Sequence, residues 1–267
     1  MKLFFSESQS DYDRYLYPYV VWAVPEAGEA PADIFNAGFL PSARGLGQFY
    51  LCRNVRVDLA KFILSSENRR ILRKGAGIAM TLVPRGEFDF SPARKIFYLN
   101  YAGVRYGKNV MPVERLELVF SPPLCTHLLV FTEEASGAEL GVAVLYLEAP
   151  RVAFYRYSFY DLNHVNRSLG LFLMTKAAEF FAAEKYRHLY LGTCYSERAL
   201  YKTQFAGVEF FNGFRWSPSL AELKFLLRRE SEKSGAHLLE TESYRAEFYA
   251  GDLKNLFAGG GFNVRTP

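Results

Sequence analysis

Tyr157-Ser158-Phe159-Tyr160-Asp161 opens the part of the chain that decides the fold, and four shorter motifs follow it. They are Ser168-Leu169-Gly170, Tyr190-Leu191-Gly192, Tyr201-Lys202-x-x-Phe205 and Gly213-Phe214-Arg215-Trp216. The pattern predicts a strand that ends at a polar loop, a long helix after the loop, and a second strand after the helix. This layout suits a ligand that carries phosphates and an acyl group, because the N-terminus of a helix binds phosphates.

The composition of the 267 residues is that of a folded protein. Half of the residues are apolar, 16% are aromatic and 22% are charged, which argues against disorder. The net charge of +4 permits nucleic acid as a partner without requiring it. The longest apolar segment is interrupted by Lys176 and Glu179, and the apolar start of the chain is too short for a signal peptide. We therefore expect a cytoplasmic protein with no membrane partner.

The cysteines and histidines argue against a metal site. Cys52, Cys125 and Cys194 lie far apart, no Cys-x-x-Cys pair occurs, and the four histidines are scattered. We expect no disulfide framework and no bound metal.

The sequence predicts a mixed α/β (α+β) fold. Strands are expected at 15–24, 49–57, 78–83, 128–131, 140–147, 151–159 and 188–191, and helices at 31–37, 67–74, 92–106, 113–120, 168–184, 217–232 and 240–256. We place a domain boundary near Pro122-Pro123. Residues 1–122 form an α/β half that packs on a second half, 123–267, whose hairpin, strand, helix and strand follow the order of an acetyltransferase-like (GNAT) core: a mixed sheet flanked by helices.

The loop that ends in Arg167-Ser168-Leu169-Gly170-Leu171 is the first candidate binding segment. Acyl-CoA acetyltransferases carry Arg/Gln-x-x-Gly-x-Gly/Ala here, and their loop amides cradle a pyrophosphate. This sequence keeps the first glycine and has Leu171 at the second, which counts against CoA binding. Alternatively, Ser168 is only an N-cap and Gly170 only a packing position.

A short basic helix is the second candidate. Arg69, Arg70, Arg73 and Lys74 lie within six positions and span about half of the helix circumference. They are placed to hold the phosphates of an RNA acceptor arm, or they form a solvated charged face.

These motifs together resemble the arginyl- and leucyl-tRNA–protein transferases. That family carries Ser-x-x-Gln-Arg-Arg-x-x-Arg, and this chain has Ser65-x-x-Asn68-Arg69-Arg70-x-x-Arg73. The resemblance extends in order over roughly residues 15–216, through Tyr17-Pro18-Tyr19, Gly38-Phe39-x-Pro41-Ser42 and Tyr50-x-Cys52-x-x-x-Arg56-Val57, to Tyr190-Leu191-Gly192 and Tyr201-Lys202. It implies a GNAT-like fold that takes its acyl group from a charged tRNA, without a further cofactor.

Four residues are the candidate catalytic groups. Tyr201 is placed to hydrogen-bond the ester carbonyl or the leaving ribose hydroxyl, and Lys202 to hold a phosphate or the acceptor carboxyl. Alternatively, Tyr201 packs and Lys202 points to water. Asp161, beside Tyr160, is placed to relay a proton from the attacking amine, to orient an arginine, or only to make a turn. Backbone amides near Phe159 to Asp161 are expected to stabilise the oxyanion.

The donor and acceptor are expected to contact a further set of residues. This set comprises Arg167, Ser168, Gly170, Tyr195 and Arg198. The family recognises N-terminal Asp or Glu, for which Arg156, Arg167 and Arg198 are candidates. The sequence departs from the family in lacking the cysteine cluster, of which only Cys52 aligns, and in a shortened loop before Tyr201.

The resulting prediction is transfer of Arg or Leu from charged tRNA to a free amine, with the N-terminal Asp or Glu of a protein as the expected acceptor. Three alternatives remain. They are an acyl-CoA-dependent N-acyltransferase that uses acetyl-CoA, aminoacyl-tRNA-dependent modification of a small molecule or another peptide, and a degenerate GNAT that only binds a partner.

Overall fold

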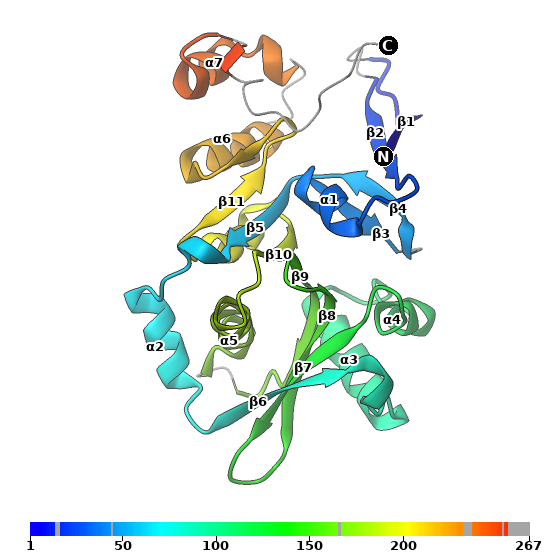
Figure 1. Ribbon diagram of the computed structural model, residues 1–267, viewed down its shortest axis with the longest axis vertical. Coiled ribbons are helices and arrows are strands. Elements are labelled where there is room, and N and C mark those ends of the chain that lie inside the picture. Colours follow the sequence, from blue (N-terminus) through cyan, green and yellow to red (C-terminus); the bar gives the residue numbers. More distant parts are fainter. Residues whose placement is uncertain (14–16, 44, 165–166, 232–236, 253, 256–267) are drawn as a thin grey trace. The chain divides into compact units, whose positions relative to one another are not determined.

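The computed structural model describes residues 1–13, 17–43, 45–164, 167–231, 237–252 and 254–255 (Figure 1). The chain divides into two compact units. The first comprises Met1–Arg56, Thr193–Gln204 and Val208–Pro267, and the second comprises Val57–Gly192 and Phe205–Gly207. Within the described part of the chain, no helix combines the length and the apolar character that crossing a membrane requires.

Five strands of the second unit belong to a mixed sheet, in which they follow the order β10-β9-β8-β7-β6. Their bounds are β6 Ile78–Pro84, β7 His127–Glu133, β8 Glu139–Glu148, β9 Val152–Tyr160 and β10 His188–Thr193, of which Thr193 falls in the first unit. β9 and β10 are parallel and the other neighbours are antiparallel. The expected mixed α/β fold is confirmed, and so is the order of hairpin, strand, helix and strand.

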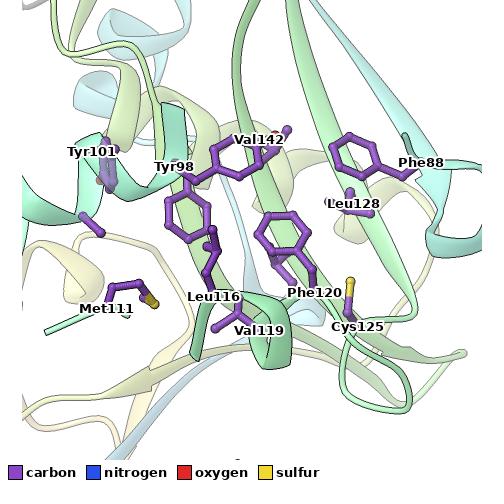
Figure 2. Close-up of a cluster of buried hydrophobic side chains, with 13 residues drawn as sticks. Phe88, Tyr98, Tyr101, Met111, Leu116, Val119, Phe120, Cys125, Leu128 and Val142 are labelled. Carbon is purple, nitrogen blue, oxygen red and sulfur yellow. The ribbon is translucent and has the colours of Figure 1, made fainter. Parts of the chain in front are cut away.

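Helices cover both faces of this sheet (Figure 1). On one face α3 (Pro92–Arg105) and α4 (Val113–Val119) enclose a cluster of buried side chains, most of which Figure 2 labels. The rings of Tyr98, Phe120 and Phe159 stack in this cluster, with centroids 4.9–5.7 Å apart. On the other face α5 (Leu169–Ala183) lies against the sheet, where Phe172 contacts Phe131 edge-on.

α2 (Ser66–Lys74) packs against α5. Ser65 and Asn68 exchange hydrogen bonds of 3.0 and 3.1 Å in a capping box, which fixes the start of the helix. Gly75 is the C-cap and ends the helix, as predicted. The Phe172 ring lies so close to Gly75 that a Cβ at this position would approach it to 2.0 Å. The end of α2 is therefore held against the first turns of α5.

The first unit contains an antiparallel sheet in the order β1-β2-β4-β3. Its strands are β1 (Lys2–Glu7), β2 (Tyr19–Val24), β4 (Gly45–Leu51) and β3 (Phe39–Ser42), and α1 (Pro31–Asn36) contacts it through Phe35 and Phe49. The same unit holds a strand pair, β11 (Val208–Phe211) and β12 (Trp216–Ser217), and the helices α6 (Leu220–Ser231) and α7 (Glu242–Tyr249).

A buried carboxylate ties the C-terminal elements of the first unit together. The Glu222 side chain on α6 is 2% exposed and accepts hydrogen bonds of 2.6–2.9 Å from four neutral groups. The donors are Ser217 of β12, Asn212, and the hydroxyls of Tyr244 and Tyr249 on α7. One side chain thus joins three segments.

Several predicted elements differ from the structure. The strand expected at 49–57 is two strands, β4 and β5 (Asn54–Asp58), because the chain turns at Cys52 and Arg53, where the Asn54 amide donates to the Cys52 carbonyl. The strand expected at 15–24 begins at Tyr19, and residues 14–16 lie outside the described part. The helix expected at 240–256 is η5 (Leu238–Glu240) followed by α7, and residues 253 and 256 lie outside the description.

The expected boundary near Pro122-Pro123 does not coincide with the division into units. It falls inside the second unit, since β6 precedes it and pairs along its whole length with β7, which follows it. β5 begins in the first unit and ends in the second. The chain therefore leaves the first unit and returns to it, so the two halves of the sequence are not the two units.

We expect Gly75→Ala to lower the free energy of unfolding by about 1–3 kcal/mol, because the new methyl group overlaps the Phe172 ring. Gly103→Ala is the matched control. Gly103 lies within α3 and a Cβ there meets nothing within 4 Å, so alanine should stabilise the protein by about 0.5–1 kcal/mol. Urea denaturation of both variants checks this, and equal effects of the two changes would contradict the packing of α2 on α5.

Candidate functional site

A β-bulge interrupts β9 at Arg156. Tyr155 is opposite Leu145 and Tyr157 is opposite Val144, so Arg156 has no counterpart on β8. A bulge leaves its extra residue outside the ladder and re-aims the strand, and bulges occur often beside active sites. The Arg156 guanidinium donates to the carbonyls of Val119 and Leu124, both at 3.1 Å and both in the second unit. These two hydrogen bonds hold the side chain in place.

The parallel pairing of β9 with β10 is short. It covers three residue pairs and ends at Phe154 and Tyr190, while β9 continues beside β8 to Tyr160. The bulge at Arg156 lies two residues after the last of these pairs. Beyond Phe154, the backbone of β9 is therefore not paired with β10.

Tyr160 is the last residue of β9 and contacts two helices. Its ring lies edge-on to Tyr101 of α3, with centroids 4.8 Å apart, and its hydroxyl accepts a 3.1 Å hydrogen bond from Arg105 Nη2. A Cβ on Gly170 would come within 2.5 Å of the same hydroxyl. Gly170 therefore leaves room for Tyr160, which is the packing role that the sequence left open.

Asp161 makes a turn. Its Oδ1 accepts hydrogen bonds of 2.8 Å from the backbone amide and the side-chain amide of Asn163, and His164 lies 3.6 Å from Oδ2. Its own amide donates to the Leu140 carbonyl at 2.8 Å. This amide is engaged, so within the segment from Phe159 to Asp161 that was expected to stabilise the oxyanion, the Asp161 amide is not available.

The start of α5 departs from a simple cap. Ser168 occupies the N-cap position in the left-handed conformation with φ 51°, and its side chain makes no capping hydrogen bond. Arg167 Nη1 pairs with Glu133 Oε1 at 3.2 Å, at the end of β7. Residues 165 and 166 of this loop lie outside the described part.

The basic helix α2 lies at the same edge of the second unit as this loop. Gly75 contacts Phe172 of α5, the Gly77 carbonyl accepts from the Glu134 amide, and Glu133 pairs with Arg167. The basic residues differ in their partners. Arg70 pairs with Glu67 at 2.5 Å and Arg69 donates to the Leu64 carbonyl, whereas Arg73 is exposed and Lys74 is half-buried. Among the described residues, neither Arg73 nor Lys74 forms a close ion pair with a carboxylate, although the charge of Lys74 acts on Glu67.

The remaining site candidates lie in the first unit. η4 (Glu197–Thr203) is a 3-10 helix that carries Arg198, Tyr201 and Lys202. Arg198 and Tyr201 are exposed. The Lys202 ammonium is largely buried and donates to the Thr193 carbonyl at 2.8 Å. The alternative in which Tyr201 packs and Lys202 points to water is wrong, because the structure has the reverse.

Burial lowers the pKa of Lys202, although the thiols of Cys194 and Cys52 act in the opposite direction. Burial also raises the pKa of Cys52, so this thiol stays protonated. Tyr195 is half exposed, and its hydroxyl accepts from the Arg53 amide at 2.8 Å, with the Arg53 guanidinium 4.9 Å from the ring centre. Within the described ranges, no group of three His, Cys, Asp or Glu side chains is placed to hold a metal ion.

Sequence reasoning missed two features of the second unit, Arg105 and the bulge at Arg156. Arg105 ends α3 and carries no motif that marks it. The bulge shifts the alternation of β9 by one residue, but Phe154, Tyr155 and Tyr157 place aromatic residues at both odd and even positions, so the shift is not readable.

Comparisons with known proteins point to a transferase. No family model matches the chain. An aspartate/glutamate leucyltransferase of Xylella fastidiosa is 25% identical over 177 residues, which cover 62% of this chain and 68% of that protein. A protein of the same name from Saccharophagus degradans is 27% identical over 171 residues, which cover 62% of this chain and 70% of that protein. One from Methylorubrum populi is 28% identical over 156 residues, which cover 53% of this chain and 60% of that protein.

The solved structures that resemble this chain share less sequence identity with it than these relatives do. The GCN5-related glucosamine N-acetyltransferase region of a fungal β-N-acetylglucosaminidase matches with a TM-score of 0.42 and 9% identity, over 60% of this chain and 19% of that one. FemX matches with a TM-score of 0.39 and 10% identity, over 53% of this chain and 52% of that one. Scores of this size do not establish a common fold.

We expect the pH dependence of stability to report the buried Lys202. Its pKa in the folded protein lies below the ordinary 10.5, so between the two values the unfolded chain holds a proton that the folded chain lacks. The free energy of unfolding therefore rises with pH in the window just below 10.5 and falls as the pH drops through it. Lys202→Met should lack this rise, whereas Lys224→Met, exposed on α6, should keep it. The free energy of unfolding is measured against pH by urea denaturation. Parallel curves for the wild type and both variants would contradict the buried position of the Lys202 ammonium.

Proposed function

We propose that this chain is an aminoacyltransferase that moves an amino acid from a charged tRNA to the N-terminal amine of a protein or peptide that begins with Asp or Glu. The observation that carries the proposal is the similarity to the aspartate/glutamate leucyltransferases. The names of these relatives favour Leu over Arg as the transferred residue, and they favour an acidic acceptor.

The reaction depends on positioning the two substrates and on stabilising the oxyanion, and it requires no nucleophile from the protein. The acceptor amine attacks the ester carbonyl, the ester C–O bond breaks, and the ribose hydroxyl leaves with a proton that the amine has lost. The ester of an aminoacyl-tRNA is already activated, so an enzyme gains most by orienting the two substrates and stabilising the oxyanion.

The second unit supplies features suited to these tasks. The oxyanion is assigned to the backbone of β9 around the bulge at Arg156, since the Asp161 amide is engaged with Leu140. The phosphates of the acceptor arm are assigned to α2, with Arg69, Arg73 and Lys74 as the leading cations because Arg70 is paired with Glu67. α2 reaches the start of α5 through the contact of Gly75 with Phe172.

The residues of η4 keep supporting roles in this proposal. The buried Lys202 holds the Thr193 carbonyl, which fixes η4 to the end of β10 within the first unit. Tyr201, exposed on the same element, remains the candidate for a hydrogen bond to the substrate.

The test is transfer of radiolabelled leucine or arginine from charged tRNA to peptides that differ only in the N-terminal residue, with acetyl-CoA assayed in parallel. Transfer from one tRNA to peptides with N-terminal Asp or Glu is the expected result. Turnover of acetyl-CoA with no transfer from any charged tRNA would overturn the proposal and favour an acyl-CoA-dependent enzyme.

The role of α2 is tested with Arg69→Gln/Arg73→Gln. Loss of two phosphate contacts should raise KM for tRNA and reduce the slope of log KM against log salt by about 2. The matched control is Lys108→Gln/Arg115→Gln, which removes two exposed cations of the second unit outside α2. An unchanged salt slope in the α2 variant would remove this helix from the tRNA site.

A further inference from the structure

Arg105 is the last residue of α3, beside the end of β9. Its guanidinium donates to the Tyr160 hydroxyl at 3.1 Å and also interacts with the hydroxyl of Tyr101. Its Cζ lies 5.9 Å from the centre of the Tyr160 ring. The side chain is exposed, so solvent and solutes reach it.

Arg105 differs in its partners from three other arginines of this unit, Arg94, Arg167 and Arg85. Arg94 pairs with Glu139, Arg167 pairs with Glu133, and Arg85 donates to the Phe120 and Phe88 carbonyls. Arg105 is held by two phenol oxygens and, among the described residues, has no carboxylate partner. Burial raises the pKa of Tyr101, which keeps this phenol neutral. The positive charge of Arg105 is therefore oriented but not neutralised.

The position of Arg105 is fixed from both sides of the sheet. Tyr101 is 6% exposed and belongs to the aromatic cluster under α3, which holds the last turn of the helix (Figure 2). The Tyr160 hydroxyl contacts Gly170 in the first turn of α5. An oriented guanidinium has the planar fork geometry that binds a carboxylate through two hydrogen bonds.

We propose that Arg105, oriented by Tyr160 and Tyr101, binds the side-chain carboxylate of the acceptor's N-terminal Asp or Glu. This assignment rests on the proposed function for the identity of the acceptor. The alternative anion, a tRNA phosphate, is better matched to the three cations of α2 than to one cation among aromatic rings. Of the three candidates from the sequence, Arg156 is engaged with carbonyls and Arg167 with Glu133. The third, Arg198, is exposed on η4 in the first unit and is not held by two phenol oxygens as Arg105 is.

The experiment compares peptides that begin with Asp or Asn in two assays, direct binding by calorimetry without tRNA and transfer from charged tRNA. In the wild-type protein the Asp peptide should bind more tightly and react faster. Arg105→Gln should reduce the Asp-to-Asn ratio in both assays by on the order of tenfold to a hundredfold. Arg105→Lys, which keeps the charge without the fork, and Tyr160→Phe, which removes the orienting hydroxyl, should give smaller reductions.

The ratio is measured within one preparation, so a partly unfolded variant does not change it. Arg115→Gln, an exposed arginine on α4, is the matched control and should leave the ratio unchanged. An Asp-to-Asn ratio in Arg105→Gln equal to that of the wild type would overturn the inference. A rise of KM for tRNA with that ratio unchanged would also overturn it and assign Arg105 to phosphate. Selective binding of the Asp peptide that requires Arg105, without transfer from any tRNA, would support the carboxylate site and overturn the proposed function instead.

Discussion

The stacking of Tyr98, Phe120 and Phe159 is the contact on which the geometry of the second unit depends. These three rings come from α3, from the residue after α4, and from β9, and each is fully buried. Burying aromatic side chains is strongly favourable, and their ring geometry restricts how the elements can slide. The end of β9 is thereby fixed relative to α3, and so is the position at which Tyr160 meets Arg105.

The sequence predicted the elements whose signals are local. α5 follows from its apolar spacing, α2 from a serine at its start, Ser65 or Ser66, and Gly75 at its end, and α3 from the N-cap and first-turn pair Ser91-Pro92. The mixed α/β class follows from the order of these elements. Features that depend on distant partners were not predictable. β3, β11 and β12 have only two to four residues each. The division of the chain into units depends on pairings such as β6 with β7, 43 or more residues apart in the chain.

Candidate site residues were recognisable as residue types, but their partners were not. Arg69, Arg70 and Arg73 read alike in the sequence, yet only Arg70 has its charge paired with a neighbouring carboxylate, Glu67. For Lys202 the sequence left open a substrate contact and a position in water, and the structure excludes the second, because its ammonium is largely buried and donates to the Thr193 carbonyl. The pairing of a charge depends on three-dimensional neighbours, which one sequence without relatives does not specify.

The network around Glu222 has a consequence for where the chain can be shortened. A chain that ended after α6 would remove the hydroxyls of Tyr244 and Tyr249, two of the four donors to this carboxylate, and the buried rings that cover it. A buried charge that loses hydrogen-bond donors is costly, at roughly 1–3 kcal/mol or more for each unsatisfied group. α7 is therefore part of the packing of the first unit, although none of the candidate substrate-binding residues lies on it.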